Sequence, residues 1–197
     1  MAVEISLAGV VLGAAVAIVS GITTGWILER KKTGANLDGI LASIHDELEV
    51  LGTVYSGNIG GQLEQSQSGT PFLTKMVLRQ KYFIVYPNNT GTIGQLKDED
   101  LRRSIIVTYN TANFILEVFE INNLLLDFGN VLFSHRNEHG MTPQLQQQFD
   151  LHHEKMVRHA DSLRDTHRKL KEETDRAMAG IRRYREAHPV WFRDLLD

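Results

Sequence analysis

Residues 5–28 contain no charged side chain and are mostly apolar. A helix needs about 20 such residues to cross the hydrocarbon core of a bilayer, and this run has 24. A secretory signal peptide would begin with basic residues and have a shorter apolar core, and a buried helix of a soluble domain rarely lacks every charge over this length. We therefore predict a transmembrane helix over residues 5–28, in contact with membrane lipids and preceded by a short segment, residues 1–4.

Small residues recur at every fourth position of this run, and a helix places residues four apart on one face. They are Gly9, Gly13, Ala17, Gly21 and Gly25. Two helices can approach each other closely along such a face because no large side chain separates their backbones. The spacing predicts self-association through the membrane helix.

Basic residues indicate the orientation of this helix. Arg30, Lys31 and Lys32 follow it closely, and no basic residue precedes it. Because basic residues beside a membrane helix favour the cytoplasmic side, we predict a single-pass protein with its N-terminus outside. Residues 29–36 would be a basic linker, and residues 37–197 a cytoplasmic domain.

The composition after residue 28 limits the functions to consider. This part holds all 21 lysines and arginines and 23 of the 24 acidic residues, so it gives no indication of direct nucleic-acid binding. The chain has no cysteine, which excludes disulfides, a thiol nucleophile and a cysteine zinc site. We expect no cofactor and no metal.

Three stretches alternate apolar spacings of three and four residues, which is typical of helices that pack along one stripe. They predict helices over about 37–64, 98–138 and 143–187. Asp98 can cap the second helix, and Gly140 and Pro143 leave only a short connection before the third. We predict a mainly α fold, a helical bundle with a long antiparallel coiled-coil hairpin.

The region between the first two predicted helices has a different character. Gly60, Gly61 and residues 65–71 favour a loop. Residues 82–86 are β-branched or aromatic and predict a short strand or extended segment, followed by a turn over residues 87–91. Such a segment would pack along the bundle or pair with another protein.

One short motif suggests metal chemistry. His135, Glu138 and His139 match H-x-x-E-H, in which two histidines on one helix face hold zinc and the glutamate acts as a general base. The motif lies at a predicted helix end, directly before Gly140, and no second motif supplies a third ligand. We interpret it as a solvated helix end. The sequence also has no phosphate loop or nucleophile elbow, and we expect no enzymatic activity.

Polar residues occur in the second and third predicted helices at seam positions where the repeating pattern favours apolar residues. His153 and His167 lie 14 residues apart in the predicted seam, and Asn122 lies in the seam of the second helix, as does Gly129. Polar seam residues can fix the register or the partner of a coiled coil, and histidines can also be bonded within the bundle or respond to pH. His152 and His159 fall outside the predicted seam, and we expect both to be solvated.

Two apolar regions could contact partners or membrane. The terminal residues Trp191 and Phe192, with Leu195 and Leu196, could dock on the bundle or anchor a partner. The stretch 114–133 of the second helix is unusually apolar, but its acidic residues argue against membrane insertion. These are Glu117, Glu120 and Asp127.

A segment of about 30 residues carries a resemblance. Residues 83–109 resemble a pattern in small bacterial proteins with one N-terminal membrane helix, which are similar to the membrane effectors of antiphage systems, including retrons. In retrons a reverse transcriptase and its DNA–RNA hybrid restrain a toxic effector. The matching residues are Phe83, Val85, Tyr86, Asn89, Ile93, Gly94, Asp98, Leu101, Arg102, Ile106, Val107, Thr108 and Tyr109.

The resemblance implies an effector in the bacterial inner membrane. A cytoplasmic partner, for which a reverse transcriptase–nucleic acid complex is one candidate, would hold it inactive, and release would let it assemble and permeabilise the membrane. The alternative is a non-toxic scaffold or anchor subunit that recruits a partner through its coiled-coil hairpin.

Overall fold

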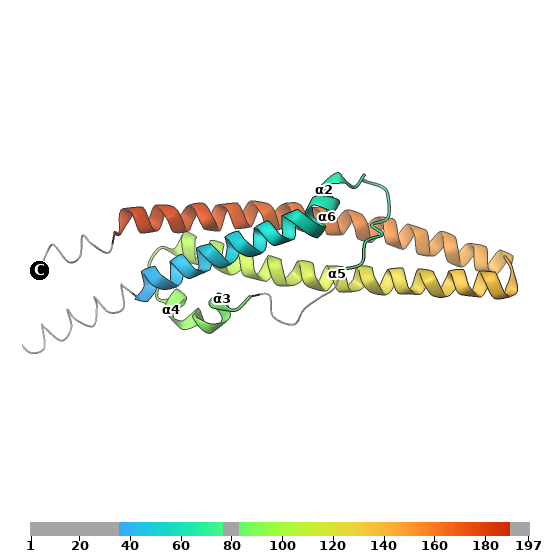
Figure 1. Cartoon of the computed structure of the whole chain (residues 1–197), viewed down its shortest axis with the longest axis horizontal. Coiled ribbons are helices and arrows are strands. Elements are labelled where there is room, and N and C mark those ends of the chain that lie inside the picture. The colour runs from blue at the N-terminus through green and yellow to red at the C-terminus, as the bar shows by residue number, and fades with distance from the viewer. Residues whose placement is uncertain (1–35, 77–82, 190–197) are drawn as a thin grey trace, which may run out of the picture.

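The computed structural model describes residues 36–76 and 83–189, and their fold is mainly helical (Figure 1). No strand occurs within these residues, which confirms the mainly α prediction. The elements in chain order are a helix described from residue 36 to residue 55, the π-helical turn η1 (Ser56–Gly60), α2 (Gly61–Gln65), α3 (Val85–Asn88), α4 (Thr90–Gly94), α5 (Glu99–His139) and α6 (Pro143–Ala187).

The α5–α6 hairpin begins and ends where the sequence predicts. The Asp98 side chain accepts a hydrogen bond from the backbone N–H of Leu101 at 2.9 Å and so caps α5. Gly140 ends α5 with a φ of 78°, a conformation that favours glycine. The Thr142 hydroxyl caps α6 at 3.2 Å, and Pro143 occupies its first turn.

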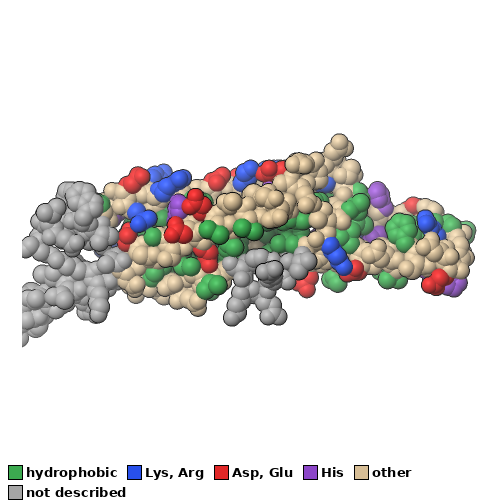
Figure 2. Space-filling model, in the orientation of Figure 1, with side chains coloured by type: hydrophobic (Ala, Val, Ile, Leu, Met, Phe, Trp, Pro, Cys, Tyr) green, Lys and Arg blue, Asp and Glu red, His purple; other side chains and the backbone are tan. Residues whose placement is uncertain are grey.

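The hairpin is covered over only part of its length. The helix of residues 36–65 packs along the half that contains the start of α5 and the end of α6, and we call this three-helix region the body (Figure 1). In the other half, residues 120–159, α5 and α6 are the only helices among the described residues, and we call this half the arm. Charged side chains line the outer side of α6 over the body, whereas hydrophobic side chains reach the surface of the arm (Figure 2).

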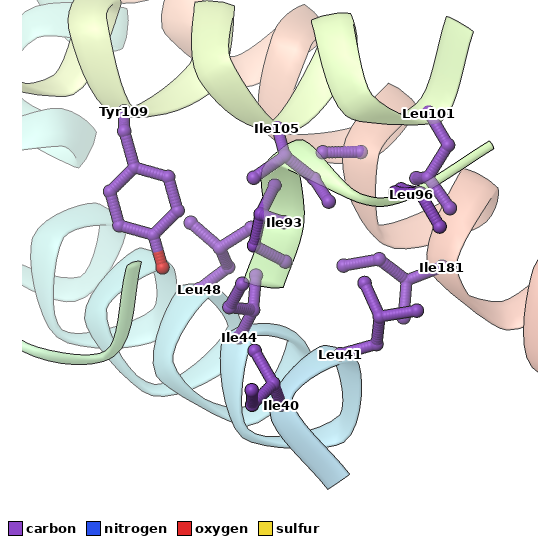
Figure 3. Packing of buried hydrophobic residues seen from close by; sticks show 11 residues of the cluster. Ile40, Leu41, Ile44, Leu48, Ile93, Leu96, Leu101, Ile105, Tyr109 and Ile181 are labelled. Carbon is purple, nitrogen blue, oxygen red and sulfur yellow. The ribbon is translucent and has the colours of Figure 1, made fainter. Parts of the chain in front are cut away.

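The body contains two apolar clusters. The first joins the start of the 36–55 helix to the ends of the hairpin helices, and its side chains converge from three sides (Figure 3). Its buried members are Ile40, Leu41, Ile44, Leu48, Ile93, Leu96, Leu101, Ile105, Tyr109, Ala177 and Ile181. Burial of such side chains stabilises the fold by roughly 1.5–3 kcal/mol for each large one.

The second cluster lies closer to the arm and includes Phe72, Ile115, Phe119 and Leu163. The Phe119 ring is fully buried and contacts the rings of Phe72 and Tyr55 at centroid distances of 6.4 and 6.5 Å. This cluster marks the end of the body, because no third helix covers α5 beyond it (Figure 1).

The first helix continues through the glycine pair, where the sequence favours a loop. The turn η1 accommodates an additional residue in the helix, and Gly60 and Gly61 permit it. A Cβ atom on Gly60 would lie 2.9 Å from the Tyr55 ring, and one on Gly61 would lie 2.8 Å from the Ser56 carbonyl oxygen. The prediction that a loop begins at these glycines was therefore wrong, because the chain stays helical through both of them. Close packing, not a turn, explains why both residues are glycine.

The extended segment predicted over residues 82–86 is also not observed where the structure describes it. Val85 to Asn88 form a helical turn, and the Glu47 carboxylate accepts hydrogen bonds from the N–H groups of Ile84 and Val85 at 2.7 and 3.0 Å. Tyr86 stacks on Tyr109 with ring centroids 4.5 Å apart. Tertiary contacts and an external carboxylate cap thus outweigh the strand propensity of this segment.

Several predicted features lie outside the described residues. They are the membrane helix 5–28 with its face of Gly9, Gly13, Ala17, Gly21 and Gly25, the basic residues Arg30, Lys31 and Lys32, and the terminal aromatics Trp191 and Phe192. Among the helices that the structure does describe, including α5, none is long and apolar enough to span a bilayer.

Candidate interaction surface

His167 is buried in the body, at a seam position as predicted, and both of its ring nitrogens have partners. The Tyr55 hydroxyl lies 2.9 Å from Nδ1, and a carboxylate oxygen of Glu64 lies 3.4 Å from Nε2. Lys171 donates a hydrogen bond of 2.7 Å to the same Glu64 oxygen. A neutral imidazole with its proton on Nε2 satisfies all of these contacts, since Nδ1 then accepts from the hydroxyl.

The electrostatics of this cluster favour that neutral form. Burial lowers the pKa of His167 despite the opposing effect of Glu64. The hydrogen bond from Lys171 lowers the pKa of Glu64 and raises that of Lys171, and burial raises the pKa of Tyr55. We interpret the cluster as a polar link between α2 and α6, because the ring nitrogens that would exchange a proton with a substrate are already occupied.

A groove of about 1230 Å³ adjoins this cluster between the first helix, α5 and α6. Its walls are mostly apolar, with Leu51, Ile115 and Met178 among them, and Tyr55 and His167 at one side. The lining residues show no arrangement of nucleophile, base and oxyanion donors, so the groove does not indicate a reaction.

The predicted seam position of His153 was wrong. His153 is exposed, and its neighbour His152 is buried against Gly129 of α5. A Cβ atom on Gly129 would lie 2.9 Å from Nε2 of His152, so the missing side chain makes room for this ring. The predicted exposure of His152 and His159 was also wrong. His152 is buried, and His159 is half-buried with its Nε2 2.9 Å from the Val118 carbonyl oxygen.

Asn122 is buried as expected of a seam residue, and its side-chain hydrogen bond goes to the segment after α2 rather than to α6. Its amide donates to the Thr74 carbonyl at 3.1 Å, and the neighbouring Asn123 exchanges two hydrogen bonds with the backbone of Met76 at 3.0 and 2.7 Å. These amides attach residues 74–76 to the base of the arm. Lys75 in this segment forms an ion pair of 2.7 Å with Asp127.

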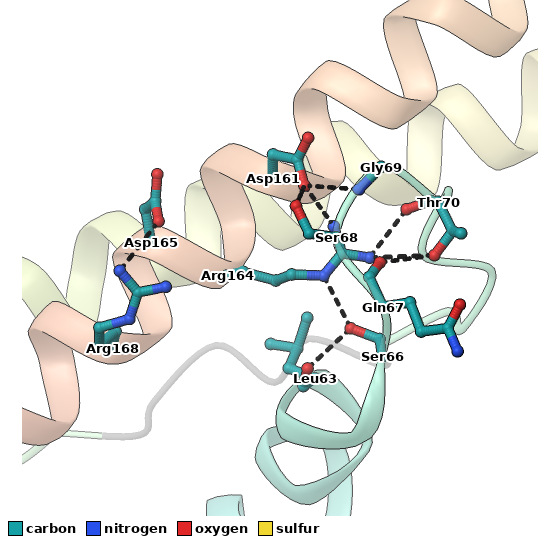
Figure 4. A network of polar contacts seen from close by, with 10 residues as sticks. All are labelled: Leu63, Ser66, Gln67, Ser68, Gly69, Thr70, Asp161, Arg164, Asp165 and Arg168. Atoms are coloured by element: carbon teal, nitrogen blue, oxygen red, sulfur yellow. Dashed lines mark hydrogen bonds and ion pairs between the residues drawn. The ribbon is translucent and has the colours of Figure 1, made fainter.

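Arg164 organises a polar network that the sequence did not indicate (Figure 4). Its guanidinium donates to the Ser66 hydroxyl, the Thr70 carbonyl and the Asp161 carboxylate at 2.9, 2.8 and 2.7 Å. Asp161 also accepts from the N–H of Gly69 at 3.2 Å, which lowers the pKa of this carboxyl group. The network fastens the loop after α2 to α6, and its members are too distant in the sequence to be recognised as a group.

Metal binding receives little support from the geometry. The rings of His135 and His139 stack at a centroid distance of 4.6 Å on the exposed end of α5. Within the described part of the chain, the one group of three potential ligands is His45, Asp46 and Glu49, whose carboxylates are exposed and lie 3.7 and 3.8 Å from the histidine. These distances describe surface ion pairs of a single helix.

A different kind of site is an exposed apolar stripe on α5, which begins at the end of the body and continues along the arm. The stripe consists of Phe114, Ile121, Leu124, Phe128 and Val131, which are 48–63% exposed. Their spacings of seven, three, four and three residues are those of a heptad repeat. The sequence shows this spacing, but it cannot distinguish an exposed stripe from the buried seam.

The stripe and the buried seam are adjoining faces of the same helix. The residue after each of Phe114, Ile121, Phe128 and Val131 is buried, and these neighbours are Ile115, Asn122, Gly129 and Leu132. One residue step turns a helix by about 100°, so α5 has a second apolar face next to the one that packs on α6. Soluble surfaces seldom carry so regular an apolar face unless it binds something.

Charge varies along the stripe. Glu117 and Glu120 are exposed at its end nearest the body, whereas His135, Arg136 and His139 are exposed at the tip of the arm. Asp127, near the middle, is paired with Lys75. Phe114 shares a shallow cleft of about 270 Å³ with Lys169 of α6.

Comparison with known proteins gives no match, whether the chain is compared with family models, curated proteins or solved structures.

Proposed function

We propose that this chain is a non-catalytic membrane scaffold, in which residues 5–28 anchor the protein and the arm binds another protein chain. The observation that carries the proposal is the exposed heptad stripe of Phe114, Ile121, Leu124, Phe128 and Val131. Helix-in-groove and coiled-coil recognition use this spacing of anchors. Covering the exposed parts of five large side chains would supply several kcal/mol of binding free energy, at roughly 25 cal/mol per Å².

The packing of the body supports this interpretation, because it holds the base of the arm in a fixed position. The Arg164 network, the amides of Asn122 and Asn123 and the two apolar clusters fasten every described segment outside the hairpin to the body or to the base of the arm. The arm itself has only one helix on each side of its seam. Within the described part of the chain, the five stripe side chains keep 48–63% of their surface exposed.

Site-specific photo-crosslinking in cells tests the scaffold proposal. A photoreactive amino acid at Leu124 of the full-length chain should give a discrete protein adduct in the membrane fraction. The matched control is the same amino acid at Gln147, which is exposed on α6 of the arm. An equal adduct pattern at both positions, or no adduct at Leu124, would contradict the proposal.

A second candidate is the toxic effector, restrained by a cytoplasmic partner and acting by assembly in the inner membrane. The small-residue face of Gly9, Gly13, Ala17, Gly21 and Gly25 favours it. Induced expression should then depolarise cells, and replacing Gly13 and Gly21 by Leu should abolish depolarisation. Val11→Leu with Val19→Leu, away from that face, should retain it. Harmless expression of the unmodified chain would leave the scaffold as the better proposal.

A further inference from the structure

We infer that the stripe on α5 binds the same stripe of a second copy of this chain, with the two α5 helices antiparallel. The inference rests on the proposed function, because it names the partner of the stripe. A twofold symmetric contact uses one patch on both copies, so the patch must be complementary to itself. The apolar spacing and the charges of the stripe both meet this condition.

The heptad spacing defines the register. The stripe has two heptad positions, one holding Phe114, Ile121 and Phe128 and the other holding Leu124 and Val131. In an antiparallel pair of helices, a residue at the first position of one helix faces a residue at the second position of its partner. The register that pairs four of the five stripe residues places Ile121 opposite Val131 of the second copy and Leu124 opposite Phe128. The twofold axis then passes near residue 126, in the middle of the most apolar part of α5.

The charges favour the antiparallel orientation over the parallel one. In this register Glu117 lies opposite His135 of the second copy and close to its Arg136. Phe114, which shares its cleft with Lys169, lies opposite Glu138. A parallel pair would instead place Glu117 beside Glu117 and His135 beside His135, and like charges in contact disfavour association.

Asp127 lies near the proposed axis, where the two copies would bring identical acids together. Lys75 removes this obstacle, because its ammonium forms an ion pair of 2.7 Å with Asp127 in each copy. The segment that carries Lys75 is held at this position by Asn122 and Asn123. The structure thus supplies a counter-charge at the point where self-association needs one.

The same charges argue against an anionic membrane surface as the occupant of the stripe. Helices that lie in such a surface carry lysine and arginine beside their apolar face. Here the exposed residues flanking most of the stripe are Glu117, Glu120 and Asp127. Apart from Lys75, which is paired with Asp127, and Lys169 beside Phe114, the basic residues near the stripe lie at the tip of the arm, where the second copy would present acids.

Cysteine crosslinking tests the register directly, because the natural chain has no cysteine to interfere. Full-length Glu117→Cys and His135→Cys chains with different tags would be co-expressed and oxidised with copper phenanthroline in isolated membranes. We expect a mixed disulfide between the two tags at several-fold higher yield than Glu117→Cys forms with itself. In the antiparallel register two Glu117 positions lie about 27 Å apart, whereas a disulfide needs Cα atoms within about 7 Å.

The outcomes separate this inference from the scaffold proposal. A predominant Glu117→Cys homodisulfide would show a parallel pair and overturn the inference. If the Glu117→Cys and His135→Cys chains form no more mixed disulfide than two Gln147→Cys chains form with each other, no second copy occupies the stripe. Photo-crosslinking at Leu124 to a different protein would then retain the scaffold proposal, and the absence of any adduct would reject both. Because every substituted residue is exposed, unchanged helical content by circular dichroism serves as the folding control.

Discussion

The body and the arm use the same two helices in different ways. In the body, α5 packs against α6 and the first helix, and large side chains such as Ile105, Phe119 and Leu163 are fully buried. In the arm, α6 is the only described helix that packs on α5, the seam contains Asn122 and Gly129, and large side chains such as Leu124, Phe128 and Val131 are exposed. The difference teaches that heptad spacing alone does not distinguish a folding surface from a binding surface, since α5 carries both.

The largest difference should appear when core residues are truncated. We expect Phe119→Ala, in the body, to lower the free energy of unfolding by about 3–5 kcal/mol, because a fully buried ring leaves a cavity between three helices. Leu132→Ala, in the arm, should cost about 2 kcal/mol, since a two-helix seam can relax around the gap. Urea denaturation followed by circular dichroism measures both, and equal costs would contradict the division into body and arm.

The next largest effect on the free energy of unfolding should come from disrupting the polar network of the body. Arg164→Met keeps much of the side-chain volume but removes the bonds to Ser66, Thr70 and Asp161. We expect a loss of about 1–3 kcal/mol, as is usual when hydrogen bonds to a charged group are removed. Arg158→Met is the matched control on an exposed face of α6 and should change stability by less than about 0.5 kcal/mol. Hydrogen exchange should locate the increased opening in residues 66–70.

Glycine substitutions give a smaller effect of opposite sign in the two regions. Gly129→Ala should destabilise the arm by about 1–2 kcal/mol, because its Cβ would lie 2.9 Å from the His152 ring. Gly52→Ala in the first helix meets nothing within 4 Å and should stabilise the body by about 0.5–1 kcal/mol. If His152→Ala does not reduce the cost of Gly129→Ala, the close contact is not its cause.

The smallest expected effect is a pH dependence in the body. Burial lowers the pKa of His167 in the folded protein, so the unfolded chain binds the proton first as pH falls below about 6.5. The stabilisation from the neutral His167 ring should therefore be fully present above this pH and decline as pH falls from about 6.5 towards 5. The charged groups that face the ring are Glu64, Lys171 and Arg168. His167→Gln should flatten this decline relative to His153→Gln, which changes an exposed ring. Identical pH profiles would reject the role of His167.

The sequence predicted the hairpin well because its determinants are local. Asp98, Gly140 and Pro143 act on their own helix ends, and the α5 and α6 boundaries were predicted within one residue. Of the two histidines predicted in the seam of α6, His167 is buried, whereas His153 is exposed and His152 is buried in its place. That choice depends on Gly129, which lies in another helix and makes room only for His152.

The sequence could not predict the parts that depend on distant partners. Residues 83–86 have strand propensity, but Glu47 caps the turn that follows and Tyr109 stacks on Tyr86. The Arg164 network joins residues more than 90 positions apart. The stripe was visible as an apolar stretch, yet its exposure follows only from the length of the first helix, which ends before it reaches the arm.

The length of the arm also determines how far apart the two bodies of an antiparallel pair would lie. With an axis near residue 126, each Leu101 would lie about 37 Å from it, at 1.5 Å per residue. The first helix begins beside Leu101 in the body, so the two copies would hold these ends about 75 Å apart. Two membrane helices joined through their glycine faces would then belong to different arm-linked pairs. If both proposed contacts form, each chain would therefore link two different partner chains, one through its arm and one through its membrane helix.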